Sequence, residues 1–139
     1  MGAVQGNVRR WLQAEGVCVL AAAVLVYAHL GYGWGVFALF FMAPDLSMIA
    51  YSRGPKFGAA VYNAAHSYIG PFLLGLAAVL HDASLQQPLL IWLAHIGFCR
   101  ATRFGLKYPD NFDDTHLGQA PFNLPAFLKG IIGRKTPTA

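Results

Sequence analysis

Charged residues are scarce in this sequence. Only 12% of its 139 residues are charged, whereas 56% are hydrophobic. Soluble domains carry roughly 25% charged residues, because their surfaces must face water. The shortage excludes an ordinary soluble domain and predicts an integral membrane protein with one domain.

Cysteine is also rare. The chain has two cysteines, Cys18 and Cys99, which both lie in apolar segments and do not form a CxxC pair. This excludes a disulfide framework, and both residues are predicted to be small packing residues. Local histidine motifs such as HExxH are absent as well, so no short motif identifies a metal.

Long apolar runs are abundant instead. Because about 20 apolar residues span the hydrocarbon core of a bilayer, four transmembrane helices are predicted, over residues 16–30, 34–51, 57–80 and 85–99. The last helix is expected to continue to Leu106, and Pro44 is expected to remove a hydrogen-bond donor from the second. The uncharged run 57–80 is predicted to be one continuous helix, around which the others pack. The predicted fold is an all-α integral membrane four-helix bundle.

The basic residues predict the orientation of this bundle. All 10 of them precede the first span, follow the last, or lie between the second and third. By the positive-inside rule both termini are cytoplasmic. The predicted organisation is therefore a cytoplasmic segment 1–15, a four-helix domain 16–108, and a cytoplasmic loop and tail 109–139. The tail has an amphipathic pattern that fits a segment lying on the membrane surface. Nucleic-acid binding is disfavoured, because topology accounts for the basic residues.

Ionisable residues inside the spans are the candidate site. Asp45 is expected about 12 Å, His66 about 15 Å and His95 about 8–12 Å from the cytoplasmic edge, at a helical rise of about 1.5 Å per residue. The three are therefore predicted to share one layer in the cytoplasmic half of the membrane, with Glu15 at its mouth. Buried ionisable residues in membranes are costly and usually functional.

Acid–base catalysis is the first hypothesis for this layer. A carboxylate beside two imidazoles suits proton transfer, and the candidate catalytic residues are Asp45, His66, His95 and Glu15. Tyr62 and Asn63 share a helix face with His66 and are candidates for binding a carbonyl or hydroxyl group. The substrate would be a hydrophobic small molecule that enters from the bilayer.

Cofactor binding is the alternative. Two histidines and a carboxylate form a ligand set for iron or zinc, and the metal candidates are His66, His95, Asp45 and His116. His66 and His95 would alternatively be axial ligands of a haem or another porphyrin-type ring. In this case the protein would be an accessory subunit of a larger membrane complex or a homo-oligomer. The two hypotheses stay open at this point.

Five motifs support a resemblance to a known family. They are APDLSM (43–48), YNAAHSY (62–68), LAHIGF (93–98), GLKYP (105–109) and DTHLG (114–118). On these motifs the chain resembles a family of small bacterial membrane proteins called domain of unknown function 4260. The resemblance implies a multi-pass protein of the bacterial inner membrane and no established activity. Arg100 and Lys107 lie in or beside the motifs, and they are candidates for binding an anionic head group.

Overall fold

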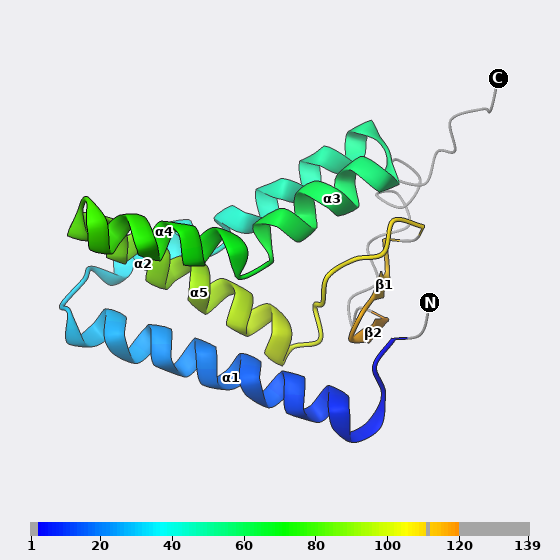
Figure 1. The fold of residues 1–139 in the computed structure, drawn as a ribbon, viewed down its shortest axis with the longest axis horizontal. Coiled ribbons are helices and arrows are strands. Elements are labelled where there is room, and N and C mark those ends of the chain that lie inside the picture. Colours follow the sequence, from blue (N-terminus) through cyan, green and yellow to red (C-terminus); the bar gives the residue numbers. More distant parts are fainter. Residues whose placement is uncertain (1–2, 111, 120–139) are drawn as a thin grey trace.

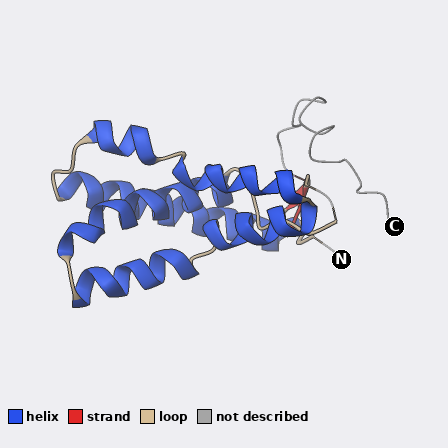
Figure 2. Ribbon diagram, turned by 90° about the horizontal axis from the view of Figure 1, so that it is seen from above, coloured by secondary structure: helices blue, strands red, loops and turns tan. Residues whose placement is uncertain are grey.

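Helices account for most of the structure, as the long apolar runs predict (Figure 1). The computed structural model describes residues 3–110 and 112–119. In chain order, the elements are α1 (Gly6–His29), α2 (Trp34–Phe40), the 3₁₀ helix η1 (Ala43–Arg53), α3 (Pro55–Ala65), α4 (Ile69–Leu80), the 3₁₀ helix η2 (Ala83–Leu85), α5 (Gln86–Ala101), β1 (Asp114–Thr115) and β2 (Gly118–Gln119). Figure 2 shows the two short strands at one end of the helical body.

Three helical segments are long and apolar enough to cross a membrane. They are Gly6–His29, Trp34–Arg53 and Pro55–Leu80. Large apolar side chains on all three face outward, and Leu25, Leu39 and Val79 are 69%, 73% and 80% exposed. So many exposed apolar side chains fit a lipid environment rather than water. The all-α class is confirmed, while the count of four spans stays a prediction, because α5 has only 16 residues.

Helix α5 lies between α1 and α4 (Figure 1) and packs most closely on α1. The two helices cross where Gly16 of α1 meets Gly97 of α5. A Cβ atom on Gly97 would lie 2.6 Å from the Leu20 amide nitrogen and 2.8 Å from the Gly16 carbonyl oxygen. Small residues permit such close approach, as is common between membrane helices. The crossing therefore fixes α5 against α1.

Pro44 interrupts the second membrane segment, as expected. α2 ends at Phe40, and the chain continues from Ala43 as a 3₁₀ helix of 11 residues. A 3₁₀ run of this length is uncommon, because its hydrogen bonds have poorer geometry. The change places Asp45 in the first turn of η1. The ring of Tyr51 in η1 packs against Gly58 of α3, where a Cβ atom would overlap it.

The prediction of one continuous helix over residues 57–80 is wrong. α3 ends at Ala65 and α4 begins at Ile69, so His66 lies in a break within the apolar segment. Pro71 lacks the N–H group that would continue the helical ladder across this break. A break exposes backbone carbonyl groups, which are tolerated at membrane depth only where protein groups bond to them.

Side chains of α5 supply those bonds. Trp92 Nε1 donates to the Ala65 carbonyl at 2.7 Å, and Arg100 donates to the His66 carbonyl at 3.0 Å. These two hydrogen bonds hold the break between α3 and α4 against α5.

The expected extension of the last helix to Leu106 is also wrong. α5 ends at Ala101, and Arg103 adopts a left-handed conformation with φ of 72°. The Phe104 N–H bonds to the Cys99 carbonyl at 2.7 Å, and the Arg103 N–H bonds to the Arg100 carbonyl at 3.2 Å. These are the two hydrogen bonds of a Schellman motif, which ends a helix and turns the chain away from its axis.

A short hairpin follows this turn. Thr115 of β1 pairs with Gly118 of β2, and the Val4 N–H donates to the His116 carbonyl at 2.9 Å. The N-terminal segment therefore docks on the hairpin. The predicted amphipathic tail falls within residues 120–139, which lie outside the described residues.

Candidate functional site

Asp45, His66 and His95 meet, as the depth argument predicts. They come from η1, from the break after α3 and from α5. His66 Nε2 lies 3.2 Å from Asp45 Oδ1 and 3.1 Å from His95 Nε2, and His95 Nε2 lies 3.6 Å from Asp45 Oδ1. Both imidazoles are buried, whereas the Asp45 side chain is 31% exposed. The prediction of a buried polar site containing these residues is confirmed.

Cys99 completes the group. Its Sγ lies 3.4 Å from His95 Nε2, one helical turn away on α5. The potential ligand atoms of His66, His95 and Cys99 all lie within 4.8 Å of one another. From the sequence alone, Cys99 is predicted to be a packing residue. Its i, i+4 spacing from His95 is the signal that could have identified it, since such residues share a helix face.

A hydrogen bond fixes the proton on the His66 ring. His66 Nδ1 lies 2.9 Å from the Tyr62 carbonyl oxygen, which only accepts, so Nδ1 is the donor. In the neutral imidazole, Nε2 then presents a lone pair to Asp45 and His95. The Tyr62 ring stacks on His66, with centroids 3.8 Å apart and an interplanar angle of 12°. Metal-binding histidines are commonly oriented by this kind of carbonyl contact.

Three of these donor atoms, those of His66, His95 and Cys99, form a group that could hold one metal ion. Zinc bonds of about 2.0–2.1 Å to nitrogen or oxygen and about 2.3 Å to sulfur place neighbouring ligand atoms about 3.3–3.6 Å apart. His95 Nε2 lies 3.1 Å from His66 Nε2 and 3.4 Å from Cys99 Sγ, and Asp45 Oδ1 lies 3.2 and 3.6 Å from the two imidazole nitrogens. Two imidazoles and a thiolate suit zinc and related transition metals chemically. The geometry therefore fits one ion held by His66, His95 and Cys99, with the Asp45 carboxylate beside it.

The same distances disfavour a porphyrin between the two histidines. Axial nitrogens on opposite faces of a ring would lie about 4 Å apart, twice a metal–nitrogen bond of about 2.0 Å. His66 Nε2 and His95 Nε2 are 3.1 Å apart, which is shorter than this spacing.

Asn63 and Lys107 form a clamp beside the site. The Asn63 side chain accepts a hydrogen bond from the Lys107 N–H at 2.7 Å and donates one to the Lys107 carbonyl at 2.9 Å. Asn63, a candidate for substrate binding, therefore holds the chain after α5 against α3. Lys107 is 5% exposed, and burial lowers the pKa of its ammonium group to about 8.

Arg100 also has a structural contact. It is 8% exposed, and its guanidinium donates to the carbonyl of His66 at the break. A cation at this position also faces the negative end of the α3 dipole. Arg100 thus positions the backbone of a site residue, and its predicted role as a head-group ligand stays untested.

Replacing Arg100 with methionine should destabilise the protein by about 1–3 kcal/mol, because a buried carbonyl would lose a charged donor. Methionine retains the apolar stem. Thermal unfolding in detergent measures the effect, with Arg10→Met as the control, since Arg10 is exposed on α1. Equal stability of the two variants would contradict a role for Arg100 at the break.

Two further predicted residues lie apart from these contacts. Glu15 is exposed on α1. His116 Nδ1 accepts a hydrogen bond from the Leu106 N–H at 2.9 Å, and burial lowers the pKa of its imidazole. The role of His116 as a metal ligand stays a prediction. The role of Glu15 in catalysis also stays a prediction.

A cavity of about 390 Å³ adjoins the donor atoms. Asp45, His95 and Cys99 line one part of it, and Lys107 lines another. The remaining walls are mainly apolar and aromatic, including Met42, Met48, Phe98, Phe104 and Phe112. This combination of an apolar cavity with a few convergent polar groups is typical of small-molecule sites.

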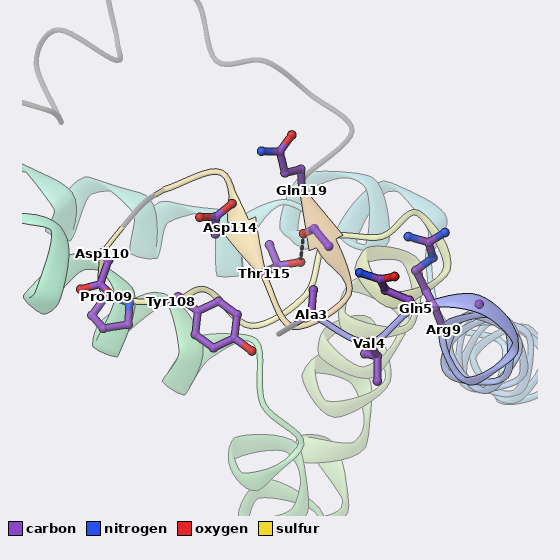
Figure 3. Close-up of a pocket in the computed structure, with 12 residues that line it drawn as sticks. Ala3, Val4, Gln5, Arg9, Tyr108, Pro109, Asp110, Asp114, Thr115 and Gln119 are labelled. Carbon is purple, nitrogen blue, oxygen red and sulfur yellow. Dashed lines mark hydrogen bonds between the residues drawn. The ribbon is translucent and has the colours of Figure 1, made fainter. Parts of the chain in front are cut away.

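A second, more polar pocket of about 610 Å³ lies where the N-terminal segment meets the hairpin (Figure 3). Arg9, Tyr108, Asp110 and Asp114 are among its lining residues, and Thr115 donates to the Gly118 carbonyl at 2.6 Å beside it. Among the described residues that line this pocket there is no histidine or cysteine. It is larger than the cavity at Asp45 but lacks that cavity's donor set.

Comparison with known proteins gives one match. A family model described as a domain of unknown function (DUF4260) matches residues 9–120. No curated protein and no solved structure matches the chain. The matched range contains all four of the residues that meet at the site, Asp45, His66, His95 and Cys99.

Proposed function

This chain belongs to the DUF4260 family, whose description assigns no activity, and from its site we propose that it is a membrane-embedded metalloenzyme. His66, His95 and Cys99 would hold one divalent transition-metal ion, such as zinc, and the Asp45 carboxylate lies beside them. The observation that carries the proposal is the convergence of these three buried donor atoms, with Asp45 Oδ1 3.2 and 3.6 Å from the two imidazole nitrogens.

The surroundings give the ion a chemical role. Asp45, His95 and Cys99 line the cavity, and His66 lies against Asp45 and His95. An ion held by these residues would be within reach of a molecule in the cavity, and it would supply a Lewis acid for a carbonyl or hydroxyl oxygen. Because the walls are apolar, the substrate is lipid-soluble.

The membrane placement is part of the proposal. The protein crosses a bacterial inner membrane with both termini in the cytoplasm, so the site lies in the cytoplasmic half. The basic residues outside the predicted spans support this orientation. Arg100 and Lys107 are buried and make internal contacts, so the other basic residues are the ones that support this orientation.

Metal-free acid–base catalysis is a second candidate function. The separations of 3.1 and 3.2 Å at His66 Nε2 are also hydrogen-bond distances. Without an ion, His95 Nε2 would share a proton with His66 and Asp45, and this group would transfer protons to a substrate.

Elemental analysis of protein purified in mild detergent without chelators separates the two candidates. We expect about one transition-metal ion per chain, as in other sites with this donor set. After the ion is removed, added Co²⁺ should give a tetrahedral visible spectrum and a thiolate-to-cobalt absorption band. The Cys99→Ser variant should lose the thiolate band, and Cys18→Ser should keep it, because Cys18 is exposed elsewhere on α1.

A protein that contains no metal and does not take up Co²⁺ would reject the metal centre. Acid–base catalysis would then be the better explanation of the site. A Soret band would instead identify a porphyrin and contradict the geometry at His66 and His95.

A further inference from the structure

The cavity beside the donor atoms has a positively charged residue that the proposed metal centre does not use. Lys107 lines this cavity, although its side chain comes from the chain after α5. Its Nζ donates to the Phe112 carbonyl at 2.8 Å and lies 3.6 Å from the centroid of the Phe112 ring. It also lies 5.0 Å from the centroid of the Tyr62 ring. A buried ammonium group held by a carbonyl and two aromatic faces is a costly feature that points to a ligand.

The position of Lys107 is fixed rather than incidental. Asn63 bonds to both its N–H and its carbonyl, and Lys107 forms a bridge with Thr115 of the hairpin. The backbone is therefore held on two sides. Asp113 and Asp45 are the acidic groups whose charges act on the ammonium group, while burial lowers its pKa to about 8.

The cavity combines this cation with apolar walls and with access from the lipid-facing surface. Met42 is 55% exposed and Phe98 is 36% exposed, and both line the cavity. A ligand entering beside these two exposed side chains would come from lipid into a cavity that Met48 and Phe104 also line. Such a path suits a molecule with a long apolar chain.

We propose that the cavity binds a long-chain carboxylate, with its head group between Lys107 and the donor atoms of Asp45, His95 and Cys99. The apolar chain lies against Met42, Met48 and Phe98. A carboxylate is singly charged and matches one ammonium group, and it is also a ligand that transition metals accept. A phosphate head group carries about −1.5 to −2 charges and would require more donors than Lys107 supplies. The contact to the ion rests on the proposed function, whereas the contact to Lys107 does not.

Binding of matched amphiphiles tests the proposal. The probes are a fluorescent polyene fatty acid and the alcohol of the same chain, added to full-length protein in nonionic detergent. We expect the acid to bind at least about tenfold more tightly than the alcohol, because the ammonium group forms a charge-assisted hydrogen bond with the carboxylate. The Lys107→Met variant should lose this preference and still bind the alcohol, while Lys107→Arg should retain most of it.

Lys56→Met is the matched control, because Lys56 is exposed at the start of α3. If Lys107→Met does not fold, the comparison of acid and alcohol on the unaltered protein still decides. Equal affinity for the two would overturn the proposal, and so would tighter binding of an alkyl phosphate of the same chain length.

Metal removal distinguishes failure of this inference from failure of the proposed function. A metal-free protein whose preference for the acid depends on Lys107 would reject the metalloenzyme and support carboxylate binding. A metal-loaded protein without that preference would reject carboxylate binding alone.

Discussion

The His95→Ala variant should be purified without its metal ion. His95 Nε2 is the donor that lies within 3.1–3.6 Å of each of the other three donor atoms. Its removal would leave His66 and Cys99 on different segments, with an apolar gap between them. Loss of a residue that only orients a ligand typically costs 10–100-fold in metal affinity, so loss of the ligand itself should cost more than about 100-fold. Metal content after dialysis and competition with a chelator measure the effect.

His29→Ala is the matched control, because His29 is exposed at the end of α1. That variant should retain the full metal content. Asp45→Asn should have a smaller effect than His95→Ala, since Asp45 is partly exposed and water can replace it. A His95→Ala protein that is folded, as judged by its helical circular dichroism, and still binds metal as tightly would reject the assigned centre.

The convergence of Asp45, His66 and His95 could be predicted from the sequence. An α-helix rises by about 1.5 Å per residue, so distance along the chain from a charged edge converts into depth. This is why Asp45, His66 and His95 were expected in one layer, and the structure brings their polar atoms within 3.6 Å. Depth does not give the rotation of each helix. The contact with Cys99 therefore required the structure, although its spacing from His95 was visible.

The break at His66 could not be predicted in the same way. Hydropathy records the side chains of residues 57–80, but a broken helix is stable only if other groups bond to its free carbonyls. Those groups are Trp92 and Arg100, which lie on a different helix. Only tertiary contact shows that these carbonyls have partners.

Charge alone also gave an incomplete account of Lys107. Topology explains a basic residue after the last helix, and the positive-inside rule expects it to be solvated. The structure instead buries it against Tyr62 and Phe112, with Asn63 bonded to its backbone. The amide group of Asn63 holds this loop, and its predicted role in binding a substrate stays a prediction.

The crossing of α1 and α5 should be sensitive to one added methyl group. In Gly97→Ala, the new Cβ atom would lie 2.6 Å from the Leu20 amide nitrogen, so backbone rather than a flexible side chain would have to move. Overpacking typically costs about 1–3 kcal/mol and occasionally more. We expect Gly97→Ala to lower the thermal stability by an amount in this range.

Gly75→Ala is the control for the same change of residue. There the new Cβ atom would lie 3.4 Å from Leu89 Cδ2, an ordinary contact, and alanine favours helix over glycine by about 1 kcal/mol. The control should therefore be as stable as the original protein or more so.

Gly97 lies between His95 and Cys99 on α5, so displacing this helix should also weaken metal binding. His95→Ala should lose metal and keep the fold, whereas Gly97→Ala should weaken both metal binding and the fold. Gly97→Ala protein as stable as Gly75→Ala would show that α1 and α5 do not pack through these glycines.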